Sequence, residues 1–319
     1  MCKVGCAGIL VSDLFCGPIP KFPREGQLVA LDQMPSEVGG CAANVAIDLV
    51  KQDVEVSILG CLGRDPDGAM LQSCLERHGI NCENLVQTTS HATSKTVILL
   101  VEGHDRRYFH MVGANSEFTV QDIDRSWLKS LEVFYLGGIF SMPGIDLREL
   151  AELLDFCRAN QVTTVVDVVI PQDFEGNDAL REILPHVDYF MPNDEEAKLI
   201  TGQTSPLDQL RWFSNAGSHA VVITKGHEGA VAMHEGEVWQ SSAYQLPAID
   251  PSGAGDAFAS GVVFGLLRHW EMSKLLPYAS AIGASAVRAV GTTSSVFSSE
   301  EAMRFIENNP LDVASSRFA

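Results

Sequence analysis

One short stretch carries most of the information about the fold: Asp250-Pro251-Ser252-Gly253-Ala254-Gly255-Asp256. Its two glycines allow a tight turn in which several backbone amides point toward one spot. A helix is expected to begin near Gly255, and the positive end of its dipole adds to those amides. We therefore predict an anion hole, formed by Gly253, Ala254 and Gly255, that suits a phosphoryl group in transfer.

Asp256 follows this turn at the start of the predicted helix. From there its carboxylate can accept a proton from an attacking hydroxyl, which is the general-base role in phosphoryl transfer to an alcohol. The alternative is a glycine-rich loop in which Asp256 only caps the helix. The stretch is not a Walker A loop, because no Gly-Lys-Ser or Gly-Lys-Thr follows its glycines.

Outside this stretch, short apolar runs rich in valine and isoleucine alternate with amphipathic segments. The runs that indicate buried strands are Val4–Val11, Val54–Cys61, Val133–Leu136, Thr163–Asp167, Tyr189–Met191 and Val221–Thr224. The segments with helical periodicity are Ala42–Lys51, Asp67–His78, Leu147–Asn160, Asp194–Thr201, Leu207–Ala216, Gly255–Leu267, Met272–Arg288 and Glu300–Asn309. This alternation predicts an α/β fold of three layers, doubly wound, with a mainly parallel sheet between two layers of helices.

Two segments interrupt the alternation. Leu14–Pro35 contains four prolines, and Lys95–Val112 reads as two strands around a turn at Gly103-His104-Asp105. We expect both to form a small β-sheet lid, residues 13–35 and 95–112, inserted into an α/β core of residues 1–12, 36–94 and 113–319.

The composition excludes several classes of protein. The 319 residues include 22 basic and 41 acidic side chains, a formal net charge of −19. This balance argues against a nucleic-acid partner, which needs clustered lysine and arginine, but a few backbone amides can still bind a small anion. No apolar run reaches the roughly 18 residues of a membrane-spanning helix. The eight cysteines, Cys2 among them, form no CxxC pair, so we expect reduced thiols in a cytoplasmic protein.

The stretch from Asp250 to Phe258 resembles the C-terminal signature of the ribokinase-like (PfkB) family of carbohydrate kinases. The resemblance implies a ribokinase-like fold and an ATP-dependent kinase that phosphorylates a sugar hydroxymethyl group, with Asp256 as base. A second family motif is Gly39-Gly40-Cys41-Ala42-Ala43-Asn44, whose Gly-Gly and Asn contact sugar hydroxyls in the family. Cys41 stands where ribokinases typically carry lysine, which argues against ribose as the substrate.

The resemblance also implies other substrate ligands. Asp13 matches an acidic residue that binds two sugar hydroxyls, and carboxylates are good acceptors for such pairs. Asn115, in Gly113-Ala114-Asn115, is a candidate neighbour of substrate or phosphate. Arg107, beside Arg106 and Tyr108, is a candidate for holding a carboxylate, as in the family's 2-keto-3-deoxygluconate kinases; a solvent-facing or lid–lid basic pair is the alternative.

For the nucleotide and metals, the family pattern points to four further segments. Asn193 and Glu196 match an Asn-x-x-Glu motif of the Mg²⁺–phosphate network, with Glu196 acting through water; a helix cap is the alternative. Thr224, Gly226 and Gly229 match the nucleotide loop, and Gly253 and Gly255 lie against ATP phosphates. A monovalent-cation site, suited to K⁺, is implied at residues Asp250, Ser252, Ala286, Ala289, Gly291 and Ser295.

The leading prediction is therefore a kinase that uses ATP and Mg²⁺ and acts on a small sugar or sugar acid of the fructose, 2-keto-3-deoxygluconate or ribose type. A nucleoside kinase of the same family is the alternative within kinases. A ligand-binding protein that kept the fold without catalysis is the alternative of another class. The resemblance further implies that lids can pair in a homodimer.

Overall fold

The computed structural model describes residues 3–104, 106–171 and 177–318. Its largest element is a nine-stranded sheet with the order β15-β14-β13-β12-β11-β10-β9-β1-β4. The strands are β1 (Val4–Gly8), β4 (Val56–Leu59), β9 (Val133–Gly137), β10 (Thr163–Asp167), β11 (Tyr189–Met191), β12 (Ala220–Thr224), β13 (Ala230–His234), β14 (Glu237–Ser241) and β15 (Val313–Arg317). Pairing is parallel from β4 to β12 and antiparallel from β12 to β15.

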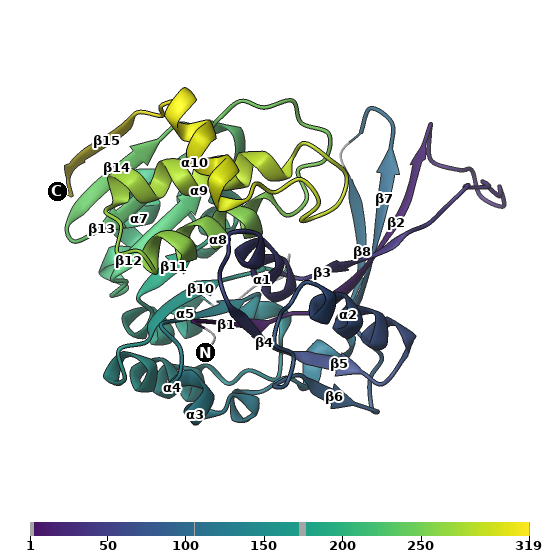
Figure 1. The fold of residues 1–319 in the computed structure, drawn as a ribbon, viewed down its shortest axis with the longest axis horizontal. Helices are drawn as coiled ribbons and strands as arrows, with labels where there is room; N and C mark the ends of the chain where they lie inside the picture. Colours follow the sequence, from purple (N-terminus) through teal and green to yellow (C-terminus); the bar gives the residue numbers. More distant parts are fainter. Residues whose placement is uncertain (1–2, 105, 172–176, 319) are drawn as a thin grey trace.

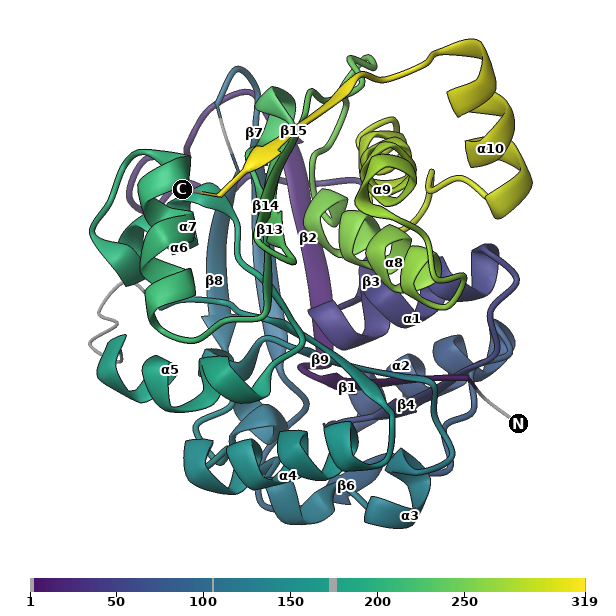
Figure 2. The same ribbon diagram turned by 90° about the vertical axis from the view of Figure 1, so that its left-hand side faces the viewer.

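Helices cover both faces of this sheet, as the two views at right angles show (Figures 1 and 2). They are α1 (Cys41–Lys51), α2 (Pro66–Arg77), α3 (Arg125–Leu128), α4 (Leu147–Ala159), α5 (Asn177–Ile183), α6 (Asp194–Thr201), α7 (Pro206–Asn215), α8 (Ala254–Leu266), α9 (Met272–Ala286) and α10 (Ser299–Asn308). Strand β9 shows why two layers form: Val133 and Tyr135 belong to one hydrophobic cluster with residues of α1, α8 and α9, and Phe134 and Leu136 belong to another with residues of α4. Alternate side chains point to opposite faces, and both faces are apolar.

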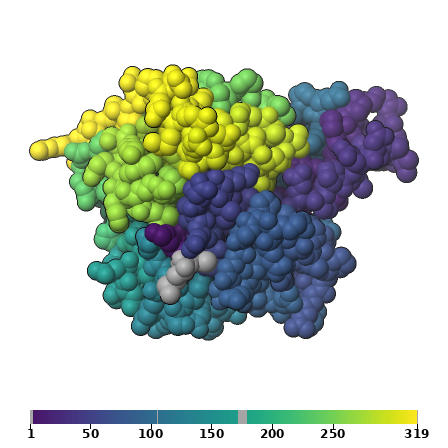
Figure 3. All heavy atoms as spheres, in the orientation of Figure 1, coloured from purple at the N-terminus to yellow at the C-terminus, as the bar shows by residue number. Residues whose placement is uncertain are grey.

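A second, four-stranded sheet projects from the body of the molecule (Figures 1 and 3). Its order is β3-β2-β7-β8, with β2 (Val11–Ile19), β3 (Ser36–Gly39), β7 (Lys95–Val101) and β8 (Arg107–Met111). A two-stranded sheet is formed by β5 (Cys61–Gly63) and β6 (Val86–Thr88), which come between β4 and β7 in the sequence. We call the four-stranded element the small sheet.

The fold class predicted from the sequence is confirmed: a three-layer α/β core with a mainly parallel sheet, plus a separate small sheet. Strands β10 and β11 and helix α6 have the predicted bounds. The hairpin β13–β14 and strand β15, which extend the sheet with antiparallel pairs, were not predicted. The turn expected at residues 103–105 includes Asp105, which lies outside the described residues, as does Cys2.

The expected first strand, Val4–Val11, is wrong as a single element. The backbone of Ile9 still bonds to Gly137 in the large sheet, whereas Ser12 bonds to Ser94 beside the small sheet. The chain therefore changes sheets between Gly8 and Val11, because its hydrogen-bond partners change. Ser36–Gly39, which the sequence assigned to the core, likewise pairs with β2 in the small sheet.

Candidate active site

The glycine-rich stretch forms the loop before helix α8 and the first residues of that helix. Gly253 is the N-cap residue, and its φ of 76° lies in the left-handed region that favours glycine. A Cβ atom there would overlap the carbonyl oxygen of Thr292. Ala254 and Gly255 begin the helix, and the first N–H groups of a helix have no partner within it. These amides and the helix dipole make the start of α8 a place that attracts an anion.

Asp256 lies in the first turn of α8 and is held from α1. The side-chain amide of Asn44 donates to Asp256 Oδ2 at 2.7 Å, and Asn44 Oδ1 accepts from the hydroxyl of Thr292 at 2.9 Å. Burial raises the pKa of Asp256, while hydrogen bonds from Asn44 and Cys41 lower it. A desolvated carboxylate with a raised pKa is a stronger proton acceptor than an exposed aspartate.

Asp13, on strand β2, lies close enough to Asp256 for the two carboxylates to interact electrostatically. Its side chain is buried, and Gly39 on the paired strand β3 leaves the space that its carboxylate occupies. Burial raises the pKa of Asp13 to about 7, with further increases from the charges of Asp256 and Glu37. Gly40 then caps the start of α1 and so leads directly to Asn44. The predicted sugar-binding residues of both segments thus converge beside Asp256.

A second group of acids also lies close to Asp256. Asp167, at the end of β10, accepts from Tyr135 Oη at 3.0 Å and from the Val168 amide at 2.7 Å. Three potential metal-ligand atoms, one each from Cys41, Asp167 and Asp256, lie within 4.8 Å of one another. Burial, followed by the charges of Glu196 and Asp256, raises the pKa of Asp167.

Asn193 and Glu196 form the reciprocal cap of α6 that the sequence left open. The Asn193 amide donates to Glu196 Oε2 at 2.9 Å, and the Glu196 amide donates to Asn193 Oδ1 at 2.8 Å. Glu196 nevertheless lines a cavity of about 200 Å³ with Asp167 and Asp256. Burial raises the pKa of Glu196 to about 7. Closely spaced, desolvated carboxylates of this kind suit a hard divalent cation such as Mg²⁺, which supplies the missing positive charge.

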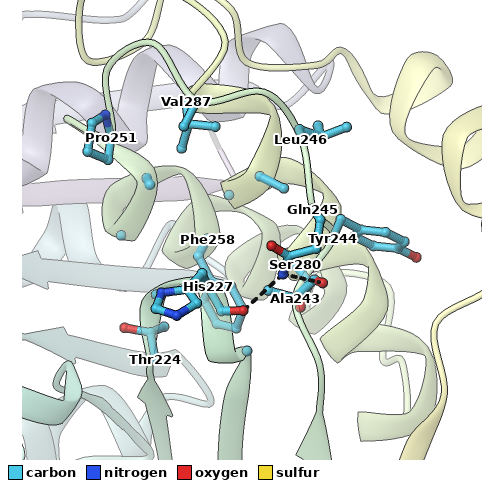
Figure 4. A pocket seen from close by; sticks show the side chains of 17 residues that line it. Thr224, His227, Ala243, Tyr244, Gln245, Leu246, Pro251, Phe258, Ser280 and Val287 are labelled. Carbon is cyan, nitrogen blue, oxygen red and sulfur yellow. Dashed lines mark hydrogen bonds between the residues drawn. The ribbon is translucent and has the colours of Figure 1, made fainter.

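A larger cavity, of about 430 Å³, adjoins this one (Figure 4). Thr224, Gly226 and Gly229, the predicted nucleotide-loop residues, line it. The rest of its lining is mostly apolar and includes Leu246, Phe258, Val287, Gly283 and Ala284. Thr224, Ala254 and Gly255 line both cavities, so the larger one opens toward the start of α8. A ligand with a flat apolar ring in this cavity and phosphates at the start of α8 fits the shape of the two cavities.

Gln245 shapes the rim of the larger cavity. Its side-chain amide donates to the carbonyl oxygens of His227 at 3.0 Å and Ala243 at 3.2 Å, as the dashed lines in Figure 4 show. The bond to His227 joins the loop after β12 to the segment after β14.

Two predicted substrate residues make other contacts in the structure. Asn115 is fully buried, and its amide group bonds to both the N–H and the carbonyl of Leu10, at 3.2 and 3.1 Å. It therefore ties two backbone segments together. Arg107 is exposed and stacks over the ring of Phe22 at 4.3 Å. Side chains alternate along β8, so Arg107 faces away from the side of the small sheet that carries Asp13.

Several of the residues expected to hold a monovalent cation bond to other protein groups. Arg106 Nη1 lies 2.9 Å from Asp250 Oδ1 and also donates to the Ser252 hydroxyl. The Ser295 hydroxyl donates to the carbonyl of Ala286 at 2.8 Å. Gly291 donates its amide to Asp250 Oδ2 at 3.2 Å, and Ala289 lies in the turn just before it.

Sequence reasoning missed three contributors: Arg106, Tyr135 and Thr292. The two-residue alternation of β8 could have separated Arg106 from Arg107, since only one of two neighbours on a strand faces a given side. No local signal identifies Tyr135 or Thr292, whose partners lie 32 and 248 residues away along the chain.

Solved structures identify the fold. The chain superposes on an Arabidopsis thaliana ribokinase in complex with ribose and ATP with a TM-score of 0.82, 19% identity, and coverage of 96% of this chain and 99% of the other. A structure from Escherichia coli that holds ATP and Mg²⁺ gives a TM-score of 0.80 at 23% identity, covering 97% and 100%. The fold is the ribokinase-like fold.

The family follows from the sequence match. Residues 5–298 match the pfkB family carbohydrate kinases, so the chain belongs to this family. Members of the family are phosphotransferases with an alcohol group as acceptor, and this chain is an enzyme of that kind.

Relatives within the family act on different acceptors. The chain is 23% identical to a ribokinase of Haemophilus influenzae over 295 residues, 91% of this chain and 94% of the relative. It is 26% identical to an Escherichia coli fructokinase over 270 residues, 81% and 88%. It is 23% identical to a nucleoside kinase of Methanothermobacter thermautotrophicus over 293 residues, 90% of each chain. In the described part of the chain, no helix is long and apolar enough to cross a membrane.

Proposed function

We propose that this enzyme transfers the γ-phosphoryl group of ATP to a hydroxymethyl group of a small neutral sugar, with Asp256 as the general base. The observation that carries the proposal is the 2.7 Å hydrogen bond from Asn44 to Asp256 in the first turn of α8. This bond places the proposed base, Asp256, next to the sugar-orienting amide of Asn44 and at the positive end of helix α8. The hydroxyl gives its proton to Asp256 while the amides of Gly253, Ala254 and Gly255 stabilise charge on the phosphoryl group.

ATP occupies the 430 Å³ cavity, with its base between the apolar wall and the loop of Thr224, Gly226 and Gly229. Its phosphates reach the start of α8. Asp167 and Glu196 would hold Mg²⁺ there, Glu196 through water, because burial and nearby negative charges make a bound cation favourable beside these carboxylates. When bound, Mg²⁺ neutralises phosphate charge. The ATP and Mg²⁺ held by the Escherichia coli structure support this assignment.

The charge around Asp13 favours a neutral acceptor. Burial, followed by the negative charges of Asp256 and Glu37, raises the pKa of Asp13. Of the two neighbouring arginines at the start of β8, Arg106 bonds to Asp250 and Arg107 faces away from Asp13. A sugar acid such as 2-keto-3-deoxygluconate would bring another carboxylate to these acids, whereas hydroxyls of a fructose- or ribose-type sugar donate hydrogen bonds to Asp13.

A nucleoside is the second candidate acceptor, on one observation. Tyr108 lies on the same side of the small sheet as Asp13, and about half of its side chain (53%) is exposed. An aromatic ring at this position can stack on a base while Asp13 binds the ribose hydroxyls.

The small sheet acts as a lid on the core and as a dimer surface. Its side away from Asp13 exposes apolar side chains, among them Phe109 (64% exposed) and Met111 (46%) on the edge strand β8. We assign this face to a homodimer contact, since exposed apolar edge strands otherwise promote aggregation. The described cysteines are free thiols, which supports a cytoplasmic location.

The test is a coupled assay of ATP consumption with Mg²⁺ across ribose, fructose, tagatose phosphate, 2-keto-3-deoxygluconate and nucleosides. We expect turnover with a neutral sugar that Asp256→Asn abolishes. Turnover with 2-keto-3-deoxygluconate alone would contradict the neutral acceptor, and turnover with nucleosides alone would favour the second candidate. Tight sugar binding without ATP consumption would favour a non-catalytic binding protein.

A further inference from the structure

Arg106 reaches from the small sheet into the loop that carries the anion site. It precedes β8 and, by the alternation of that strand, lies on the same side as Tyr108 and His110, and hence as Asp13. Its guanidinium lies 2.9 Å from Asp250 Oδ1 and donates to the hydroxyl of Ser252. The pair is shielded from solvent, with side-chain exposures of 18% for Arg106 and 4% for Asp250.

Asp250 connects three separate parts of the structure. Its Oδ1 also accepts from the amide and hydroxyl of Ser252, at 3.0 and 2.8 Å, and its Oδ2 accepts from the Gly291 amide at 3.2 Å. Gly253, which opens the anion site, follows Ser252 directly. The charge on Asp250 therefore holds the loop before α8, the turn after α9 and the tip of the small sheet in one arrangement.

The expected monovalent-cation ligands do not fit a bound K⁺ in this arrangement. K⁺ needs several oxygen lone pairs, but both carboxylate oxygens of Asp250 already accept hydrogen bonds. The hydroxyl of Ser252 donates to Asp250 and accepts from Arg106, so its oxygen lies against a guanidinium. The positive charge beside the buried Asp250 comes from Arg106 instead. Removing one partner of a buried ion pair is strongly unfavourable, because it leaves the other charge uncompensated.

We propose that the guanidinium of Arg106 is the built-in cation of the anion-site loop, so that this enzyme needs no monovalent cation. Arg106 is a positioning residue: it acts on the reaction through Asp250 and Ser252, which orient the amides at the start of α8. Because Arg106 belongs to the small sheet, its charge reaches the loop only when that sheet lies against the core. Closure of the small sheet and ordering of the anion site are thus one event.

This inference rests on the proposed kinase activity for its kinetic readout, so the first measurement is independent of turnover. Thermal unfolding of the wild-type enzyme is followed in KCl, NaCl and tetramethylammonium chloride at equal ionic strength. We expect equal midpoints in the three salts. A ligand that binds only the folded state raises the midpoint, so a rise specific to K⁺ would overturn the proposal.

The same salts are then compared in the kinase assay, with sodium or tetramethylammonium ATP. We expect kcat/KM of the wild type to be equal in the three salts, and activation by K⁺ of about tenfold or more would overturn the proposal. If no acceptor is phosphorylated in any salt, the proposed function fails, while the unfolding experiment still decides the role of Arg106.

Arg106→Gln tests the charge itself, since glutamine keeps hydrogen-bonding capacity but is neutral. We expect kcat/KM to fall roughly 10- to 100-fold in tetramethylammonium chloride, the scale of a displaced catalytic loop, and to recover in part with guanidinium or K⁺. Arg211→Ala, which removes an exposed arginine paired with Asp208, is the control and leaves activity unchanged. Full activity of Arg106→Gln without K⁺ would overturn the proposal. If that variant does not fold, the wild-type comparisons decide.

Discussion

The amide of Asn44 on α1 and the carboxylate of Asp256 on α8 lie 2.7 Å apart although 212 residues separate them in the chain. The contact exists because α1 and α8 pack side by side on one face of the large sheet. Each helix starts next to a glycine turn, at Gly40 and Gly253, so both side chains project from a first turn. The loops that precede two neighbouring helices thereby form one site. It lies at the carboxyl ends of the parallel strands, where ligands bind in open α/β sheets.

Asp256→Asn is the direct test of the base. Asparagine keeps the size of the side chain but cannot accept the hydroxyl proton, so kcat is expected to fall by at least about 10²-fold. KM for ATP is expected to stay near the wild-type value, because the 430 Å³ cavity is formed without this side chain. Steady-state kinetics with the best acceptor provide the measurement. An unchanged kcat would remove Asp256 from the chemistry.

Asp13 gives a prediction for stability as a function of pH. Its pKa is about 7 in the folded protein, against about 4 for an ordinary aspartate. Between these values the folded state keeps a proton that the unfolded state releases, so the free energy of unfolding falls as pH rises from about 4 to 7. Asparagine has no such penalty. Asp13→Asn is therefore expected to raise the melting temperature at pH 8 more than at pH 4.5, while KM for the acceptor rises.

The control for this experiment is Asp208→Asn, a change at an exposed aspartate on α7. Thermal unfolding of the wild type and both variants at the two pH values isolates the effect of Asp13. The same stability difference at pH 4.5 and pH 8 would show that the folded protein does not hold the extra proton on Asp13.

The sequence could predict the core of the fold but only part of the site. Strands such as β9 are buried on both faces and read as apolar runs, whereas β14 and β15 are partly exposed and carry no such run. Asp13, Asn44 and Asp256 follow from motifs. The partner of Arg106 does not, because the bond to Asp250 spans 144 residues and depends on which side of β8 faces the core. Asn115 was expected at the substrate, but its hydrogen bonds to Leu10 give it a structural role.

The side of the small sheet that faces away from Asp13 predicts a homodimer that introduced negative charges should dissociate. Phe109 and Met111 point to the same side of the edge strand β8 and are 64% and 46% exposed. In Phe109→Glu/Met111→Glu, like charges replace apolar contacts between two copies, so sedimentation is expected to show a monomer where the wild type is a dimer. The matched change Leu199→Glu alters an exposed leucine on α6 and should leave the dimer intact. A monomeric wild type would contradict the assignment of this face.

Gly39 tests whether the position of Asp13, beyond its charge, matters for binding the acceptor. A Cβ atom at residue 39 would overlap the Asp13 carboxylate, and the backbone there does not need a positive φ. Gly39→Ala is therefore expected to move the carboxylate without straining β3, and to raise KM for the acceptor about tenfold or more with KM for ATP unchanged. In an Asp13→Ala background the carboxylate is already gone, so adding Gly39→Ala should have little further effect, and the two changes should be strongly non-additive. Additive effects would mean that Gly39 acts on the acceptor by its own backbone and not through Asp13.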